Sequence, residues 1–365
     1  MAEQDIYGSR FAGRDLPLEG IASRLPHPPI PAAPHPQTPI LPAGTTSTVG
    51  LLGSTVLPSF NLHAAFAAVT YGLARYTDRV EGKDWLWPTS ITANAWWNAI
   101  GTYVINDDLT IPEAWSRLDY SQKLLLGGVS VWGLRLLYRI VSRSAKRGRD
   151  DPRYAAVKKD ERFWNLAFFS LFLPEAVAQT LISLPFTLSF RAPTQSGLAS
   201  PPVTSIGGFL HSLSIFLFSA GFFLETAADY QLEAHKKADY DAGILREGVW
   251  GIVRHPNYLG DALIQASFSI LLLSGNLLHP LAILAPVTNY IFLRFNGGNK
   301  EDENSRQDRY SKSDPLKAQQ FKAYRQDVNS FWPDLNGLKS KWTQVAVAAG
   351  VGGMFAEWAA RTLVH

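Results

Sequence analysis

The sequence predicts an all-α fold, a polytopic membrane bundle of about seven transmembrane helices. Three observations point to it: apolar runs long enough to cross a bilayer, basic loops that alternate with non-basic loops, and no strand-type alternation of apolar and polar residues. Hydrophobic residues make up 46% of the 365 residues, and charged residues only 18%. Soluble domains average about 25% charged residues. The composition therefore favours a membrane protein with polar loops.

The first segment, residues 1–46, is rich in proline and includes LPHPPIPAAPHPQTPILPAG. Such a composition builds neither a helix nor a core, so we expect an extended, disordered leader. A polyproline ligand for a partner is the alternative. No basic flank precedes an apolar core in this segment, so we expect no secretory signal there.

Seven apolar runs follow the leader, each near the roughly 20 residues that cross a bilayer core. They are Val49–Ala74, Leu86–Ile105, Lys123–Val141, Phe163–Phe190, Ile206–Ala228, Pro256–Leu273 and Leu278–Phe295. An eighth run, VAVAAGVGGMFAEWAARTLV, carries Glu357 and Arg361 four residues apart. This pair favours an interfacial or packed amphipathic helix over a span.

The loops between these runs alternate in charge. Lysine and arginine are dense in residues 143–162, 235–254 and 300–325, whereas NDDLTIPEAWSRLDYSQ, RAPTQSGLASPPVTS and GNLLH contain few. The positive-inside rule places the basic loops in the cytosol, and seven spans then place the N-terminus on the opposite side. A soluble helical bundle gives no reason for this alternation.

Charge and residue usage exclude several classes of function. The net charge is +3 and no long basic arm is present, so we expect no nucleic-acid binding. The absence of cysteine excludes disulfides, zinc–thiolate sites and thiol catalysis. The histidines lack metal-ligand spacing, and no GxGxxG follows a predicted strand, so we expect neither a metal site nor a Rossmann cofactor site.

A dense polar cluster stands at the start of the sixth run, in GVWGIVRHPNYLGD. Proline suits the first turn of a helix, so we expect the helix to begin at His255 or Pro256. The free N–H groups of this helix end, with Arg254 beside them, form a natural phosphate or carboxylate site. A carboxylate one turn inside a membrane helix, here Asp261, indicates a functional site. The alternative is that Asp261 only balances the helix dipole or pairs with Arg254.

Two further polar groups flank this cluster. In FFLETAADYQLEAHKK, the side chains of Glu225, Asp229 and Lys236 fall on one helical face. Glu225 lies inside an apolar run, so we expect it to face the bundle interior. After the seventh run, FKAYRQDVNSFWP combines aromatics, a cation and a closing proline, and such a segment can fold back over the site.

Four motifs between Arg147 and Pro333 carry a family resemblance: RGRDDPRY, ETAADYQ, GVWGIVRHPNYLGD and AYRQDVNSFWP. Together they resemble the C-terminal region of the steroid 5-alpha-reductase superfamily, including the branch called DUF1295. The third motif is the most specific, and it is also similar to the version in sterol C14-reductases, which has aspartate at the position of Asp261. Most of the DUF1295 branch has glutamate there. The resemblance implies a multi-helix membrane protein, by analogy in the endoplasmic reticulum, that binds NADPH in the cytosolic half of the bundle and reduces a carbon–carbon double bond in a lipid.

Carried over position by position, the resemblance places ten residues around the cofactor: Glu225, Asp229, Lys236, Arg254, His255, Asn257, Tyr258, Asp261, Glu301 and Tyr324. Glu303 is the alternative to Glu301. The basic members would hold phosphates, while the aspartates and the asparagine would bind ribose hydroxyls and the nicotinamide amide. Tyr258 is the candidate proton donor by position alone. The glutamate and tyrosine that polarise the substrate carbonyl in steroid reductases have no recognisable counterpart.

The resemblance divides the chain into the leader (1–46), N-terminal membrane helices on the substrate side (47–142), a cofactor-binding membrane domain (143–335) and a C-terminal amphipathic or membrane helix (336–365). Three functions stay open. The first is an NADPH-dependent reductase of a lipophilic substrate. The second is an S-adenosylmethionine-dependent methyltransferase, because isoprenylcysteine carboxyl methyltransferases share a related R-H-P-x-Y helix start. The third is a non-catalytic scaffold that kept the pocket. The basic residues favour the phosphate-bearing NADPH.

Overall fold

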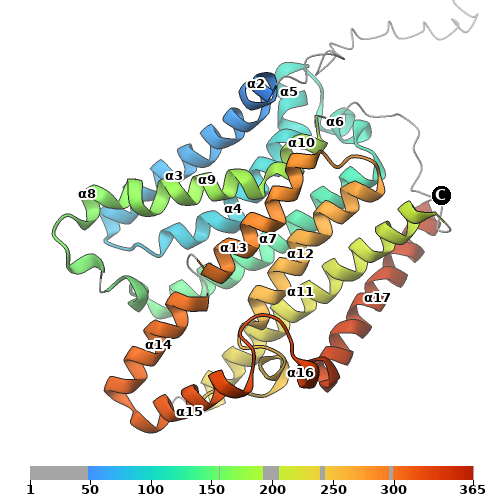
Figure 1. The fold of residues 1–365 in the computed structure, drawn as a ribbon. Coiled ribbons are helices and arrows are strands. Elements are labelled where there is room, and N and C mark those ends of the chain that lie inside the picture. Colours follow the sequence, from blue (N-terminus) through green and yellow to red (C-terminus); the bar gives the residue numbers. More distant parts are fainter. Residues whose placement is uncertain (1–47, 156, 192–204, 239–242, 296–298, 365) are drawn as a thin grey trace, which may run out of the picture. The chain divides into compact units, whose positions relative to one another are not determined.

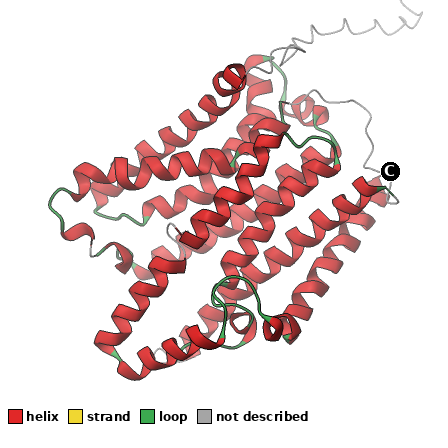
Figure 2. Cartoon of the chain, in the orientation of Figure 1, coloured by secondary structure: helices red, strands yellow, loops and turns green. Residues whose placement is uncertain are grey.

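The computed structural model describes residues 48–155, 157–191, 205–238, 243–295 and 299–364, and the regular elements in these ranges are all helices (Figure 2). The expected leader lies outside the described residues. The long helices run back and forth and pack side by side (Figure 1). The protein is therefore all-α, as the sequence predicts.

The helical passes are built from single helices or from short helices in line. In chain order they are α2 (Thr48–Leu51), η1 (Leu52–Val56) and α3 (Leu57–Thr77); α4 (Gly82–Trp96), η2 (Trp97–Gly101) and α5 (Thr102–Asn106); α7 (Tyr120–Arg147); α8 (Phe163–Ala167), η5 (Phe168–Phe172), α9 (Leu173–Ile182) and α10 (Leu184–Ser189); α11 (Ile206–Ala238); α12 (Pro256–Ser274); η7 (Pro280–Ile283) and α13 (Leu284–Phe295); and α17 (Lys341–Val364). The connections contain α6 (Ile111–Arg117), η3 (Pro152–Tyr154), η4 (Val157–Lys159), η6 (Gly248–Gly251), α14 (Asn299–Ser313), α15 (Pro315–Asp327) and α16 (Leu335–Lys339).

Four helical stretches of the described chain are long and apolar enough to cross a membrane: Leu52–Thr77, Tyr120–Arg147, Phe163–Ile182 and Ile206–Ala238. They coincide with the first, third, fourth and fifth predicted runs, and they make the chain an integral membrane protein. The other predicted runs form α4 with α5, α12, and α13, which are shorter or more polar. By length and hydropathy the described chain thus has four candidate spans, where the sequence predicts about seven.

Helix α11 packs along α12 on one side and along α17 on the other (Figure 1). Helix α12 continues to α13, which packs on α9, while α3, α4 and α9 contact one another and α7 lies against α4 and α12. Helices α11 and α12 approach closely at two glycines. A Cβ atom on Gly260 would lie 2.5 Å from the Gly221 carbonyl oxygen, so a side chain does not fit there. This approach brings Glu225 and Asp261 to the same level.

The predicted basic loops meet at one end of the bundle, which we call the basic end. The Glu81 N–H, in the turn before α4, donates to Asp150 Oδ1 at 3.0 Å. Lys146 Nζ, near the end of α7, lies 2.7 Å from Glu233 Oε1 near the end of α11. The first contact joins a turn to the first basic loop, and the second joins the ends of α7 and α11, from which basic loops leave. Arg254 Nε lies 2.9 Å from Glu303 Oε1, which joins the second and third basic loops. The common end is what the charge alternation of the sequence predicts.

The C-terminal segment forms α17, whose Glu357 faces the bundle. Glu357 Oε1 accepts hydrogen bonds from Tyr120 Oη at 2.7 Å and from His211 Nε2 at 3.0 Å. Apolar residues such as Phe355 and Trp358 are exposed instead. The structure thus places α17 as a helix packed along α11, with its apolar side outward.

Candidate functional site

Arginines at a four-residue interval on α7 face acidic residues at the same interval on α11. Arg135 pairs with Glu225, with an Nη1–Oε1 distance of 2.6 Å, and also with Asp229. Arg139 lies 2.7 Å from Glu233 and 3.4 Å from Asp229. Glu225 is buried and faces the bundle interior, as expected. The two arginines escape the sequence analysis, although their spacing inside an apolar run is a usable signal.

Five buried side chains from four helices converge beside these ion pairs of α7 and α11, and we call them the deep polar cluster. They are Trp132 of α7, Glu225 of α11, Asp261 and Gln265 of α12, and Asn289 of α13, each at most 4% exposed. Asn289 Nδ2 donates to Asp261 Oδ2 at 3.4 Å. The Trp132 indole and the Gln265 amide are directed at the same carboxylate without completing a hydrogen bond. Asp261 is therefore not a partner of Arg254, whose side chain pairs with Glu303 instead, and this excludes the alternative that the two residues pair.

Each member of the deep polar cluster keeps one polar atom without a hydrogen-bond partner: Trp132 Nε1, Glu225 Oε2, Asp261 Oδ1, Gln265 Nε2 and Asn289 Oδ1. An unsatisfied buried group of this kind is destabilising by about 1–3 kcal/mol. Buried polar groups in folded proteins are otherwise almost always paired. Five such atoms in one place are what a polar ligand would satisfy.

The start of α12 is held by residues 328–333, which follow α15 and which we call the closing segment. Pro256 occupies the first turn of α12, as predicted. The Arg254 N–H donates to the Asn329 carbonyl at 2.9 Å, and the His255 N–H donates to the Ser330 carbonyl at 3.2 Å. The closing segment thus folds back onto the start of α12, as the sequence suggests.

A cavity of about 190 Å³ lies beside this contact. Its lining includes Arg254, Arg294, Arg325 and Glu303. Arg254 donates to both carboxylate oxygens of Glu303, at 2.9 and 3.1 Å, and Arg325 lies 3.2 Å from the same group. Three guanidinium groups against one carboxylate leave the cavity positive, which suits a phosphate.

Glu303 is the acidic residue that organises the cavity. Burial raises its pKa, but hydrogen bonds from His255 and Arg254 outweigh burial and hold the pKa at about 2. The Glu303 carboxylate therefore stays ionised at neutral pH. The side chain of Glu301, the predicted residue, lies outside the described part of the chain, whereas its alternative Glu303 is in the site.

The remaining predicted residues surround the start of α12 to different degrees. Asn257 and Tyr258 are half-buried, and the Tyr258 ring stacks on His255 with a centroid distance of 5.2 Å and an angle of 5°. Arg153 of the loop before α8 lies within electrostatic range of Tyr258. Tyr324 is buried, and its hydroxyl donates to the Trp250 carbonyl at 2.5 Å. The structure therefore gives Tyr324 a backbone partner.

Lys236 is exposed at the end of α11. It lies within electrostatic range of Arg139, Arg143 and Arg147 on α7, and of Arg306 on α14. These like charges gather at the basic end, so Lys236 belongs to a positive rim and not to the deep polar cluster.

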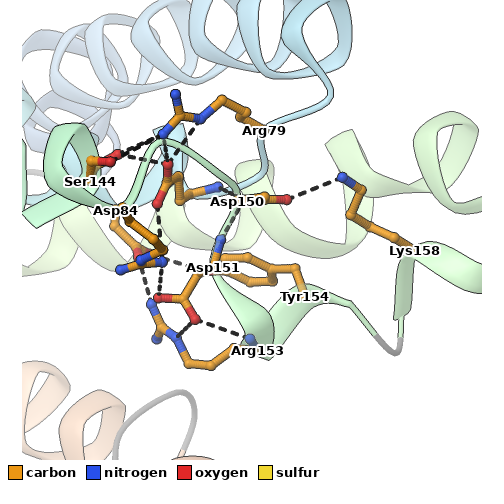
Figure 3. Close-up of polar contacts among 10 residues, drawn as sticks. Arg79, Asp84, Ser144, Asp150, Asp151, Arg153, Tyr154 and Lys158 are labelled. Atoms are coloured by element: carbon orange, nitrogen blue, oxygen red, sulfur yellow. Dashed lines mark hydrogen bonds and ion pairs between the residues drawn. The ribbon is translucent and has the colours of Figure 1, made fainter. Parts of the chain in front are cut away.

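A second polar network forms where RGRDDPRY packs against the turn between α3 and α4, and we call it the loop network (Figure 3). It comprises Arg79, Glu81, Asp84, Ser144, Arg147, Asp150, Asp151, Arg153, Tyr154 and Lys158. Asp84 accepts hydrogen bonds from Arg153 at 2.6 Å and from the Tyr154 hydroxyl at 3.0 Å. Glu81 accepts from Ser144 at 2.6 Å and from Arg147 at 3.2 Å. Most charged side chains of RGRDDPRY are thus engaged in ion pairs and hydrogen bonds within the protein.

Two tyrosines and a glutamate of the N-terminal half, the residue types that polarise the substrate carbonyl in steroid reductases, have partners within the fold. The Tyr71 hydroxyl donates to the Trp164 carbonyl at 2.6 Å, and the Tyr103 hydroxyl donates to the Phe190 carbonyl at 3.3 Å. Glu81 is held in the loop network. The structure therefore brings none of these groups to the deep polar cluster.

Comparison with known proteins identifies the family. The sequence model of the family described as "Protein of unknown function (DUF1295)" matches residues 70–328, which is most of the chain. The chain belongs to this family, as its motifs indicate, and the match extends into the N-terminal helices, well before Arg147. No curated protein and no solved structure matches the chain.

Proposed function

We propose that the protein is an integral membrane oxidoreductase that uses NADPH to reduce a carbon–carbon double bond in a lipid or sterol-like substrate. The observation that carries this proposal is the deep polar cluster with its five unpaired atoms, because α13, which supplies Asn289 to the cluster, also supplies Arg294 to the positive cavity. A ligand with phosphates at one end and an uncharged polar group at the other would satisfy both. The family resemblance of GVWGIVRHPNYLGD supports the same cofactor.

The distance between the deep polar cluster and the positive cavity supports an extended ligand. Asn289 precedes Arg294 by five residues on α13, and Asp261 lies on the second turn of α12, whereas Arg254 lies two residues before that helix begins. At about 1.5 Å per residue, the interval on α13 corresponds to about 8 Å along the helix. NADPH is long and carries phosphates, whereas S-adenosylmethionine carries none. The positive cavity therefore favours NADPH over the methyltransferase cofactor.

In this proposal NADPH, when bound, supplies the hydride. The arginines of the cavity and the N–H groups at the start of α12 hold its phosphates, and the deep polar cluster orients its ring. Tyr258, on the first turn of α12, donates the proton that completes the reduction. The basic end lies in the cytosol by the positive-inside rule, and the endoplasmic reticulum is the membrane that the family resemblance favours.

The test is a thermal-shift measurement on the detergent-purified protein with NADPH, NADH and S-adenosylmethionine. A ligand at 1,000 times its Kd should stabilise the protein by about 4 kcal/mol. We expect a shift with NADPH that Asp261→Ala and Arg294→Ala abolish, and that the control Glu357→Gln on α17 keeps. Tyr258→Phe should bind NADPH but fail to reduce any lipid that the wild type reduces.

Two other outcomes would replace the proposal. A shift with S-adenosylmethionine alone would assign the site to a methyltransferase. No shift with any of the three ligands would leave the non-catalytic scaffold.

A further inference from the structure

We infer that α17 is a further membrane-crossing helix, and that its outward apolar face contacts the hydrocarbon core of the bilayer. The inference is independent of the proposed function. Helix α17 follows residues 70–328, the part of the chain that the family model matches, so the family does not account for it. It is also not among the four stretches that length and hydropathy select as candidate spans. The packing of α17 in the bundle carries the inference.

Helix α17 runs antiparallel to α11, from the basic end of the bundle to the opposite end (Figure 1). Near its start α17 contacts η6, which lies in the second basic loop, and Ala346 packs in the same apolar cluster. In its middle, a Cβ atom on Gly350 would lie 2.6 Å from the Phe216 ring, so the two helices approach closely. Near its end, Glu357 pairs with His211, on the second turn of α11. The two helices therefore cover the same depth of the bundle.

The side of α17 that faces away from α11 is apolar. Its side chains follow one another at helical spacing, are 39–67% exposed, and include Val347, Val351, Phe355 and Trp358. No charged residue lies between Lys341 and Glu357. A contiguous apolar stripe of this kind marks a surface that contacts an apolar partner.

The neighbouring helices identify that partner as lipid. Helices α7 and α11 are candidate spans, and they too expose apolar side chains, such as Val131 and Leu134 on α7 and Phe209 on α11. A helix that lies beside a span from end to end is at the same depth in the membrane. Its outward face then continues the lipid-facing surface of the bundle.

The shape and charge of α17 argue against a helix that lies flat on the membrane surface. Interfacial helices carry a strongly charged face rich in lysine and arginine. The basic residues of α17 are Lys341 and Arg361, close to its two ends. Its 24 residues extend about 36 Å, enough to cross a hydrocarbon core of about 30 Å.

Glu357 is the one carboxylate of α17, and its surroundings remove the objection to a span. A charged side chain inside a membrane is tolerated where it faces the bundle and finds partners. Glu357 Oε1 accepts from Tyr120 at 2.7 Å and pairs with His211 at 3.0 Å, while Arg361 lies 3.7 Å away. The pair that makes the sequence look interfacial thus faces the protein.

The depth of α17 can be measured directly because the chain contains no cysteine, so a single introduced cysteine reports one position. Val351→Cys and Phe355→Cys carry a nitroxide label in the full-length protein, reconstituted into phosphatidylcholine vesicles. Oxygen enters hydrocarbon, whereas a nickel chelate stays in water, so the ratio of their collisions with the label measures depth. We expect this ratio to match that of Val131→Cys on α7 and to exceed that of Lys312→Cys, on the polar helix α14, by about tenfold.

The crossing itself is tested at the two ends of α17. Leu338→Cys lies in α16, just before α17, and Leu363→Cys lies in the last turn of α17. Sealed membrane vesicles from cells that express each variant are treated with a membrane-impermeant maleimide. We expect one variant to react in intact vesicles and the other only after detergent opens them. Lys312→Cys, in the third basic loop, should react from the same side as Leu338→Cys.

The substituted side chains are exposed, so the changes leave the fold intact. Reaction of Leu338→Cys and Leu363→Cys from the same side would overturn the crossing. A collision ratio as low as that of Lys312→Cys would place the outward face in water and overturn the lipid contact. Few collisions with either reagent would also overturn it, because the face would then be covered by protein. Disulfide-linked dimers of Val351→Cys would in that case identify a second copy of this chain as the partner.

Discussion

The loop network and the deep polar cluster use the same kinds of residue but reach opposite states. In the loop network Asp84 is met by Arg153 and Tyr154, and Glu81 by two arginines and a serine. In the deep polar cluster two carboxylates have one arginine within reach, and five polar atoms stay unpaired. The first arrangement fastens loops to helices. The unpaired atoms of the deep polar cluster gain hydrogen-bond partners only when a polar ligand binds.

The largest expected effect separates these two roles. Asp84→Ala leaves Arg153 and Tyr154 without their shared acceptor, and each of the two lost hydrogen bonds to this charged group contributes about 1.5–3 kcal/mol. Asp261→Ala removes a carboxylate that is itself poorly paired, so we expect the free energy of unfolding to change by less than about 1 kcal/mol. Thermal unfolding of both variants in detergent gives the comparison. If Asp261→Ala were as destabilising as Asp84→Ala, the deep polar cluster would be a structural element like the loop network.

Sequence analysis predicts the features of this protein that depend on residues close together in the chain. Proline at the first turn marks the start of α12, charge alternation gathers the basic loops at one end, and a glutamate in an apolar run points inward. These signals need only one helix or one loop at a time. The family motifs add Asp261 and Glu225 in the same way.

The features that escape it depend on contacts between distant helices. Trp132, Gln265 and Asn289 each look like an ordinary residue of an apolar helix, and only the packing of α7, α12 and α13 brings them to Asp261. RGRDDPRY looks like a free basic loop, because its partners Glu81 and Asp84 lie more than 60 residues earlier in the chain. Single-residue patterns do not report which charges meet after folding.

A smaller effect should appear on acidification, in the loop network and in the cavity at the start of α12. The pKa of Glu303 falls from its ordinary value of 4.5 to about 2. Its ionised form therefore stabilises the closing segment above about pH 4.5, and this contribution is lost as the pH falls from about 4.5 to 2. In the loop network, burial raises the pKa of Asp151, but Arg153 and Arg147 lower it to about 2, so its contribution disappears in nearly the same range.

Comparing the wild type with Glu303→Gln isolates the contribution of the closing segment. The shift of Glu303 corresponds to about 3 kcal/mol at most. We expect Glu303→Gln to be less stable than the wild type at pH 6 and to approach it at pH 3, as measured by thermal unfolding. Parallel pH profiles for the two proteins would show that Glu303 does not hold the segment. Asp151→Asn, measured alongside, should reveal the corresponding loss in the loop network.

The smallest effect decides between two roles for Tyr324. The family resemblance places this residue at the cofactor, whereas its hydroxyl donates to the Trp250 carbonyl at the turn before α12. Tyr324→Phe removes one neutral hydrogen bond, so we expect a loss of about 1 kcal/mol in the free energy of unfolding and an unchanged Kd for NADPH. Tyr258→Phe is the matched control, because it removes the same hydroxyl group from a half-buried tyrosine that lies on α12 itself. A Tyr324→Phe variant of wild-type stability that binds NADPH ten times more weakly would instead move Tyr324 into the site, because only a lost ligand contact weakens binding without weakening the fold.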